Sequence, residues 1–401
     1  MPYGVKIKGF NGNDMKAFAF LPKTRDAVIN AAPADDVSAK FVINERAAAL
    51  HPQRQDMVIE EVVARGDAKS YILAKKDGTP AAFFRAGQYL SLQFNFGESL
   101  VTRPYSICSS PALSKQGKYE VTIRKNPGGY AADKALETLK AGDVIAVSAP
   151  EGNFFYDPIR DGSTVIALAG GSGITPFLSM ARAITDGLED FSLVILYGSR
   201  TYDNILFRDE LDEIAGSCAK VKVVHVLSDE EKEGCESGFI TAEIIKKYMP
   251  AEGTCSVFIC GPRAMYEFAE KETSKLGLAK KFIRKELQSV TNDVSSLPGY
   301  PQEAKGKTFT LKITRGEEKY EIPAKAEEPV LAAIERACIP APSRCRCGEC
   351  GWCRSKLLSG EVFTPEDTDY RRWADKANNY IHPCSCFPVS DLEIELPGTY
   401  I

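Results

Sequence analysis

Long apolar runs and an excess of basic charge are both missing from this sequence of 401 residues. No stretch approaches the roughly 18 consecutive apolar residues that a membrane-spanning helix needs, which excludes such a helix. The 50 Lys and Arg residues are balanced by 54 Asp and Glu residues, and the formal net charge of −4 excludes the basic footprint of a nucleic-acid-binding protein. The segment from Met1 to Phe20 also lacks the continuous apolar core of a secretory signal, so we expect a cytoplasmic protein.

Histidine is rare as well: the three residues, His51, His225 and His382, show no metal-binding spacing, and we expect them to be structural. Cysteine, in contrast, is frequent. There are 12 cysteines, and six of them lie in the last 57 residues. They are too dilute for a disulfide scaffold, and their crowding near the C-terminus predicts a metal or redox site in a reducing compartment.

The hydrophobic pattern divides the chain into five segments. Residues 1–55 form an alanine-rich N-terminal extension without recognisable chemistry. Residues 56–158 contain short β-type runs between turn residues, which predicts an antiparallel barrel or sandwich. Residues 159–290 alternate strands with helices, which predicts an α/β domain with a doubly wound parallel sheet. Residues 291–306 are a polar, turn-rich linker, and residues 307–401 predict an α+β domain with a hairpin, a short helix, a cysteine-dense loop and a closing strand.

The densest cysteine pattern is Cys345-x4-Cys350-x2-Cys353, with Cys384 further along the chain. This is the spacing of a plant-type 2Fe–2S ferredoxin, in which four thiolates converge on two irons. Glycines in such a loop let backbone N–H groups approach the sulfurs and tune the potential. The spacing therefore predicts Cys345, Cys350, Cys353 and Cys384 as the metal ligands of one 2Fe–2S cluster.

Two further cysteines leave the ligand set open. Cys347 lies inside the loop and Cys386 lies two residues beyond Cys384, so either could replace one of the four. The run from Cys347 through Cys350 to Cys353 also fits the beginning of a bacterial 4Fe–4S motif, but the Cys-Pro that usually follows is absent. A zinc site would need a second cysteine pair, which is missing.

A second motif, Arg103-Pro104-Tyr105-Ser106, ends a predicted strand in the β-type segment. Arginine can neutralise a pyrophosphate, tyrosine offers a flat face to an isoalloxazine ring, and serine can donate a hydrogen bond to flavin N5. Further on, Arg124 and the pair Gly128-Gly129 precede a predicted helix, whose N-terminus would expose amides to a phosphate. These residues predict a flavin site.

A third motif follows the buried-type strand Thr164–Ala169 and reads Gly170-Gly171-Ser172-Gly173-Ile174-Thr175-Pro176. The glycines allow a tight turn and the close approach of a pyrophosphate, and the following helix N-terminus would face that anion. We expect Thr175 to be the N-cap and Pro176 the first helical residue.

Together the three motifs resemble the ferredoxin–NADP reductase superfamily, and the order flavin domain, nicotinamide domain, plant-type ferredoxin resembles the phthalate dioxygenase reductase arrangement. The resemblance covers residues 55–401. It implies an antiparallel β-barrel flavin domain, an α/β nicotinamide domain with a doubly wound parallel sheet, and a β-grasp ferredoxin domain. It also implies FAD as the flavin. FMN stays possible, because Ala132 stands where relatives often carry a Ser or Thr that touches the phosphate.

The resemblance also implies the residues of the hydride-transfer pocket. Cys260 corresponds to a cysteine that lies against the nicotinamide C4, and Gly261-Pro262 would shape the pocket. Glu286 resembles a carboxylate that contacts the same pocket, and Ser106 would lie at flavin N5. We therefore expect Ser106, Cys260 and Glu286 to be the catalytic residues.

The choice between NADH and NADPH depends on the residues after the third strand of the α/β domain. Relatives that use NADPH commonly carry Ser-Arg there, where the arginine binds the 2′-phosphate, whereas this chain has Ser228-Asp229. A carboxylate repels a phosphate and can accept from a ribose hydroxyl, which favours NADH. Arg200 could reach the same ribose and keeps NADPH open.

The function that the resemblance implies is electron transfer from NADH through a flavin and a 2Fe–2S cluster to a protein acceptor such as an oxygenase component. An oxygen-independent acceptor, such as a corrinoid or radical enzyme, is an alternative. A non-catalytic electron-transfer or assembly subunit is another, but it would have no need of Ser106 and Cys260. The ferredoxin-like residues 305–401 hold 14 Lys and Arg against 15 Asp and Glu, so we do not expect strong electrostatic steering of the acceptor.

Overall fold

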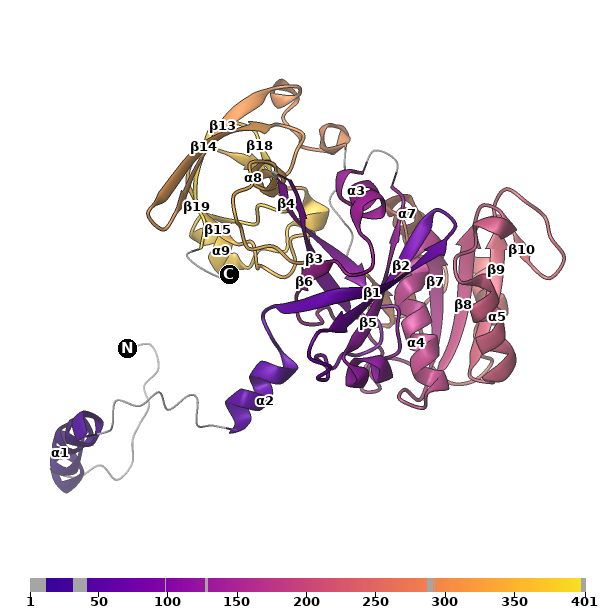
Figure 1. Cartoon of the computed structure of the whole chain (residues 1–401), viewed down its shortest axis with the longest axis horizontal. Helices are drawn as coiled ribbons and strands as arrows, with labels where there is room; N and C mark the ends of the chain where they lie inside the picture. Colours follow the sequence, from indigo (N-terminus) through magenta and orange to yellow (C-terminus); the bar gives the residue numbers. More distant parts are fainter. Residues whose placement is uncertain are drawn as a thin grey trace. The chain divides into compact units, whose positions relative to one another are not determined.

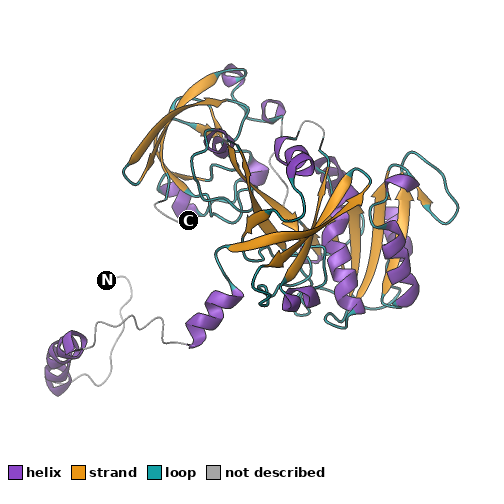
Figure 2. Cartoon of the chain, viewed as in Figure 1, coloured by secondary structure: helices purple, strands orange, loops and turns teal. Residues whose placement is uncertain are grey.

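A computed structural model describes residues 12–31, 42–97, 99–126, 129–286, 291 and 293–397. The chain forms two compact units, Met1–Ala49 and Leu50–Ile401. Helices α1 (Gly12–Ala31) and α2 (Val42–Leu50) are the described elements of the N-terminal extension (Figures 1 and 2). Within the described ranges, no helix is both long and apolar enough to cross a membrane.

The first domain of the larger unit is an antiparallel β-barrel, as predicted. Its strands are β1 (Gln55–Arg65), β2 (Ala68–Lys75), β3 (Tyr89–Phe96), β4 (Ser99–Ser106), β5 (Lys118–Arg124) and β6 (Val144–Val147). They run in the order β4-β3-β6-β1-β2-β5, and every neighbouring pair is antiparallel. A bridge between Ile107 and Val121 joins the chain just after β4 to β5, so the two end strands of the sheet meet and the barrel closes. A 3₁₀ turn (Pro111–Gln116) and helix α3 (Tyr130–Thr138) flank β5.

The second domain is a parallel sheet covered by helices on both faces. Its strands are β7 (Thr164–Gly170), β8 (Ser192–Ser199), β9 (Val221–Leu227), β10 (Glu236–Ser237), β11 (Cys255–Cys260) and β12 (Ile283–Lys285). Its helices are α4 (Thr175–Thr185), α5 (Arg208–Ser217), α6 (Ala242–Tyr248) and α7 (Arg263–Ser274). Residues of α4 and α5 pack in one apolar cluster with the sheet, and residues of α6 and α7 pack in another.

The strand order β10-β9-β8-β7-β11-β12 reverses between β7 and β11. In open α/β sheets, ligands bind at the carboxyl ends of the strands where the order reverses. The loop after β7 begins at Gly171 and the loop after β11 begins at Gly261, so both glycine-containing motifs lie at this point. The topology thus positions them for a nucleotide.

The third domain has a β-grasp fold. Strands β13 (Thr308–Arg315), β14 (Glu318–Lys325), β15 (Ser355–Ser359), β17 (Tyr380–Ile381) and β19 (Leu392–Glu395) form a sheet in the order β14-β13-β19-β15-β17, and β16 (Val362–Phe363) pairs with β18 (Phe387–Pro388). Only β13 and β19 are parallel among the pairs that the structure describes in this sheet. Helix α8 (Val330–Arg336) buries Val330, Ala333 and Ile334 in the core, and a short helix α9 (Trp373–Ala377) precedes β17.

The segment expected to be a linker packs against the third domain. Residues 294–296 and 302–304 form short 3₁₀ turns. Val294, Tyr300 and Ala304 are buried in one apolar cluster with Ala326 and Phe387. Their burial explains how a sequence rich in turn residues can nevertheless be ordered: three apolar side chains anchor it.

A buried ion pair joins the barrel to the parallel-sheet domain. Arg182 of α4 donates to the carboxylate of Glu120 on β5 at 2.6 Å and to the carbonyl oxygen of Cys108 at 2.8 Å. Arg65 lies 3.4 Å from the same carboxylate. Burial alone would raise the pKa of Glu120, but the charges of Arg182 and Arg65 outweigh burial and hold this pKa below its ordinary value.

We predict that Arg182→Ala lowers the free energy of unfolding by about 3 kcal/mol, because it removes one partner of a buried carboxylate. Urea unfolding followed by circular dichroism measures the change. Arg208→Gln, which removes an exposed pair with Asp209, is the control and should cost less than about 1 kcal/mol. The low pKa of Glu120 means that its contribution is complete above the unfolded value near 4.3 and is lost as the pH falls through the folded value. An Arg182→Ala protein as stable as the wild type would show that Arg65 alone satisfies Glu120.

Candidate redox site

The flavin motif forms the end of β4 and lies against β3. Ser106 is paired with Tyr89 and Tyr105 with Leu90 in the antiparallel ladder. The ring of Tyr105 packs edge-on against Phe94, with centroids 6.3 Å apart, and burial raises the pKa of its hydroxyl. Because β3 and β4 are fully paired, the backbone of the motif is rigid and holds its side chains in fixed positions.

Arg103 of the same motif forms an ion pair with a residue of the β-grasp domain. Its Nη1 lies 3.1 Å from the carboxylate of Glu335 on α8. Burial lowers the pKa of Arg103, and the nearby charge of Arg346 lowers it further. A guanidinium with one carboxylate partner still has donors for a phosphate, so the contact is compatible with the predicted role of Arg103.

The second part of the predicted flavin site lies at the N-terminus of α3. Gly129 is the N-cap residue of this helix, and Ala132 packs partly against the barrel core. Gly128 lies outside the described residues. Arg124, the last residue of β5, donates to Asp67 at 2.9 Å, and its Nη1 lies 3.1 Å from where a side chain on Gly171 would begin. Arg124 therefore lies between the barrel and the glycine-rich loop Gly170–Pro176, the nucleotide loop. Its charge would reach a pyrophosphate bound at that loop.

The nucleotide loop is pressed against the turn after β11. A Cβ on Gly173 would lie 2.2 Å from the carbonyl oxygen of Cys260, and one on Gly170 would lie 2.5 Å from the sulfur of Met265. A Cβ on Gly261 would meet the same sulfur at 2.5 Å. The backbone clash makes Gly173 a requirement of the contact between the two loops, a reason beyond the approach of a ligand, whereas at Gly170 and Gly261 the flexible side chain of Met265 would have to move.

The expected helix start is wrong by one residue. Thr175 is the first residue of α4 and Pro176 the second, and the N-cap position belongs to Ile174. The reason is the 3₁₀ turn of Gly171–Ile174, which winds directly into the helix. The hydroxyl of Thr175 consequently donates to the carbonyl oxygen of Ser172 at 3.0 Å and caps no amide.

Two of the three predicted catalytic residues, Cys260 and Glu286, lie at the end of β11. Cys260 is the last residue of this strand, and the backbone N–H of Glu286 donates to the carbonyl oxygen of Ile259 at 3.0 Å. Burial raises the pKa of the Cys260 thiol, and the charge of Glu286 adds to the effect. Burial also raises the pKa of the Tyr89 hydroxyl, and the Glu286 charge contributes there too. Tyr89, the ladder partner of Ser106, is therefore near enough to Glu286 for the two to interact electrostatically.

The residues expected to choose the nicotinamide lie side by side at the carboxyl ends of β8 and β9. The N–H of Ser228 donates to the carbonyl oxygen of Ser199, and that of Asp229 donates to Arg200, each at 3.0 Å. The hydroxyl of Ser228 donates to the Asp229 carboxylate at 2.6 Å. Both Asp229 and Arg200 are exposed, so a carboxylate and a guanidinium group lie at the same edge of the parallel sheet.

The four predicted cluster ligands converge. The sulfurs of Cys353 and Cys384 lie 3.3 Å apart, and the thiol of Cys345 interacts with those of Cys347, Cys350 and Cys384, so Cys347 lies in the same group of thiols. The backbone N–H of Cys350 points to the sulfur of Cys345, and that of Trp352 to the sulfur of Cys350, each at 3.4 Å. Among the described residues, no His, Cys, Asp and Glu group is arranged for a single metal ion. Two thiol pairs with amide donors instead fit a cluster of two irons.

The two additional cysteines differ in their surroundings. Cys386 is fully buried in the apolar core of the β-grasp domain with Leu311 and Ile394. Cys347 packs with Cys345 and with Tyr89 of the barrel. The loop thus borders the barrel on the side of Cys345, whereas Cys350 is exposed.

Sequence reasoning missed three residues of this region. Tyr89 contacts the loop of residues 343–353 that carries Cys345, Cys347, Cys350 and Cys353, the cysteine loop. Glu335 contacts Arg103, although 232 positions separate Glu335 from Arg103. His382, expected only to be structural, is hydrogen-bonded through Nδ1 to the carbonyl oxygen of Gly348 in the same loop. No local pattern indicates Tyr89 or Glu335, because their roles depend on contacts between domains.

Comparison with known proteins agrees with this organisation. Residues 58–156 match the oxidoreductase FAD-binding domain family, residues 167–271 the oxidoreductase NAD-binding domain family, and residues 313–389 the 2Fe-2S iron-sulfur cluster binding domain family. The chain is 29% identical to NADH oxidoreductase HCR of Escherichia coli over 77% of its own length and 88% of that protein. It is also 29% identical to phthalate dioxygenase reductase of Burkholderia cepacia, over 77% of its length and 87% of that protein.

A solved structure of phthalate dioxygenase reductase is similar in all three domains. It superposes with a TM-score of 0.61 and 27% identity, over 86% of this chain and 97% of that structure. That protein is a modular structure for electron transfer from pyridine nucleotides to a 2Fe–2S cluster. The chain is therefore an oxidoreductase of the ferredoxin–NADP reductase superfamily, a flavoprotein with a C-terminal plant-type 2Fe–2S domain and the domain order of phthalate dioxygenase reductase.

Proposed function

We propose that this chain is an NADH-dependent reductase that delivers electrons, through a flavin and a 2Fe–2S cluster, to a protein acceptor such as an oxygenase component. The observation that carries the proposal is the position of Tyr89. It is the ladder partner of Ser106 in the flavin motif, and it packs against Cys345 and Cys347 of the cysteine loop. The side chain of Tyr89 therefore lies between the predicted flavin site and the predicted cluster site.

The roles of the flavin-site residues follow from their positions. Arg103, Arg124 and the α3 N-terminus with Gly129 offer positive charge and amides to the flavin phosphates. Tyr105 and Ser106 would border the ring, and Gly128 and Ala132 complete the proposed phosphate loop. When bound, the flavin supplies two-electron chemistry with a nicotinamide and one-electron chemistry with iron, and the cluster supplies single electrons to the acceptor.

The nucleotide would lie along the loop Gly170–Pro176 and the turn Gly261–Pro262, where the strand order reverses. Cys260 is 8% exposed, and its raised pKa keeps the thiol protonated at neutral pH. A neutral, buried thiol provides a water-poor surface for a nicotinamide ring, and Glu286 places a carboxylate beside it. Ser228 and Asp229 would border the adenosine ribose.

The acceptor would approach the cluster from the side of Cys350, which is exposed while Cys345 is 3% exposed and faces the barrel. Relatives include the glycine betaine monooxygenase reductase subunit of Chromohalobacter salexigens, 27% identical over 78% of this chain, which supports an oxygenase component as acceptor. None of the twelve cysteines, all of which lie in the described ranges, is paired in a disulfide, which supports a reducing compartment such as the cytoplasm.

We predict that Cys384→Ser abolishes the electron paramagnetic resonance signal of the reduced cluster, because it removes a thiolate that lies 3.3 Å from Cys353. Cys386→Ser is the matched control: its side chain packs in the apolar core, and the signal should persist. Reduction of ferricyanide by NADH, which needs only the flavin, should survive in both variants, whereas reduction of cytochrome c should be lost in Cys384→Ser. The reverse pattern of signals would assign Cys386 as the fourth ligand. A wild-type protein that oxidises neither NADH nor NADPH with ferricyanide would refute the proposed function.

A further prediction concerns the nicotinamide. Asp229→Ser should raise kcat/KM for NADPH relative to NADH by about tenfold or more, because it removes a carboxylate that repels the 2′-phosphate. Steady-state ferricyanide reduction with each nucleotide measures the ratio. Asp190→Ser, which changes an exposed acid just before β8 at the opposite edge of the sheet, should leave the ratio unchanged. If the wild type already prefers NADPH, Arg200 rather than Asp229 controls the choice.

A further inference from the structure

One carboxylate joins the barrel to the cysteine loop. Glu335 lies on α8 of the β-grasp domain and is 5% exposed. Its Oε1 accepts a hydrogen bond from the backbone N–H of Thr102 at 3.0 Å, and its Oε2 lies 3.1 Å from Nη1 of Arg103. Both donors belong to β4 of the barrel, so this acid of one domain is bound by the strand that carries the flavin motif of another.

The same carboxylate holds the cysteine loop. Nη1 of Arg346 lies 2.9 Å from Oε1 of Glu335, and Arg346 directly follows Cys345. Arg346 has a φ of 61°, a left-handed conformation that non-glycine residues rarely adopt and that persists only where the surroundings enforce it. The ion pair with Glu335 is one contact that holds its side chain in place.

Glu335 is the carboxylate that pairs with both arginines of this group of charged side chains. Two guanidinium groups, from Arg103 and Arg346, share a single carboxylate, and the side chains of Arg346 and Glu335 are both almost completely buried. Removing the anion would leave two cations facing each other out of water, which is strongly unfavourable. The two arginines therefore approach each other only because Glu335 lies between them.

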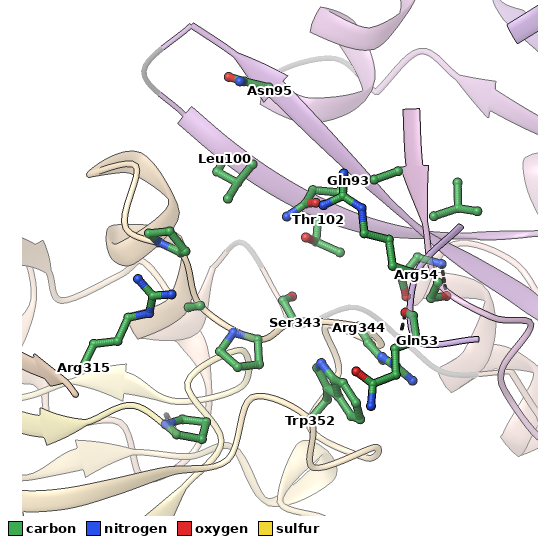
Figure 3. Close-up of a pocket in the computed structure, with 18 of the residues that line it drawn as sticks. Gln53, Arg54, Gln93, Asn95, Leu100, Thr102, Arg315, Ser343, Arg344 and Trp352 are labelled. Carbon is green, nitrogen blue, oxygen red and sulfur yellow. Dashed lines mark hydrogen bonds between the residues drawn. The ribbon is translucent and has the colours of Figure 1, made fainter. Parts of the chain in front are cut away.

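Packing alone does not fix the two domains in this region. A cavity of about 450 Å³ lies between them, lined by Gln93 and Thr102 of the barrel and by Ser343, Arg344 and Trp352 of the cysteine loop (Figure 3). Tyr89 packs against Cys345 and Cys347 elsewhere in this interface, but around the cavity individual polar contacts gain importance.

A second polar contact completes the attachment of the loop. Arg344 pairs with Glu151 of the barrel, and its guanidinium lies 3.4 Å from the centre of the Trp352 ring. Arg344 and Arg346 flank Cys345 on either side. The ligand that faces the barrel is thus held at both of its neighbours, by Glu151 and by Glu335.

We propose that Glu335 is a positioning residue that docks the β-grasp domain on the flavin-binding strand and so sets the separation between the flavin motif and Cys345. This inference rests on the proposed function, because that separation matters only if electrons pass between the two sites. It assigns Glu335 a role in coupling the sites that neither the flavin motif nor the cysteine spacing indicates.

The test is Glu335→Gln in the full-length holoprotein, which keeps the shape of the side chain and removes its charge. Two readouts are compared with the wild type: hydrogen exchange of the peptide that contains the Thr102 amide, and cluster-dependent cytochrome c reduction, defined as the part that Cys384→Ser removes. We expect exchange to become about tenfold faster or more, and cluster-dependent turnover to fall by a similar factor, while ferricyanide reduction stays within about twofold of wild type.

Glu328→Gln is the matched control. Glu328 also accepts from a backbone N–H, that of Lys325 at 2.9 Å, and from an arginine, Arg336 at 2.6 Å, but all of these groups belong to the β-grasp domain. Neither readout should change in this variant. Glu335→Asp, which keeps the charge on a shorter side chain, should restore part of the lost turnover.

Several outcomes would overturn the inference. Unchanged Thr102 exchange and unchanged cytochrome c reduction in Glu335→Gln would show that the carboxylate does not dock the domains. An equal loss of ferricyanide and cytochrome c reduction would show a general role in folding or flavin binding rather than in coupling. Failure of the wild type to oxidise NADH would refute the proposed function instead, and the exchange measurement would still decide whether Glu335 docks the domain.

Discussion

A carboxylate buried between domains must have cationic partners. Ion pairs of this kind join the parallel-sheet domain and the β-grasp domain, the two outer domains, to the barrel. Glu120 on β5 receives Arg182 from the parallel-sheet domain, and Arg103 on β4 binds Glu335 from the β-grasp domain. β4 and β5 are the two end strands of the sheet, which meet where the barrel closes. The two ion pairs that join the outer domains to the barrel are therefore made by the two strands that meet where the barrel closes.

The position of the predicted flavin site follows from this arrangement. Arg124 at the end of β5 reaches the nucleotide loop beside Gly171, while Tyr89 on β3 reaches Cys345. The barrel thus contributes one contact toward the proposed nicotinamide site and another toward the proposed cluster ligands. Both residues lie on paired strands, which fixes the backbone from which each side chain extends.

Much of the fold could be predicted from the sequence because it depends on local patterns. Apolar alternation indicated the barrel, strand–helix alternation indicated the parallel sheet, and cysteine spacing indicated the four converging thiols. The strand β4 was expected only at its end, since Pro104 and polar residues interrupt its apolar pattern. Thr175 was misplaced because a 3₁₀ turn extends the helical region upstream. Glu335 and Tyr89 could not be predicted at all: their partners lie in other domains, and a lone Glu on a short helix resembles any surface acid.

The cysteine loop is unevenly exposed to water, with Cys345 covered by the barrel and Cys350 open to solvent. Water stabilises added negative charge far better than a protein interior does, and backbone N–H groups near the sulfurs add to this effect. Burial alone would therefore favour added negative charge at the outer edge of the loop, whereas the guanidinium groups of Arg344 and Arg346, which flank Cys345, favour it on the barrel side. Negative charge on this loop thus depends on two arginines for its stabilisation at the side that faces the barrel, and on water at the side that faces solvent.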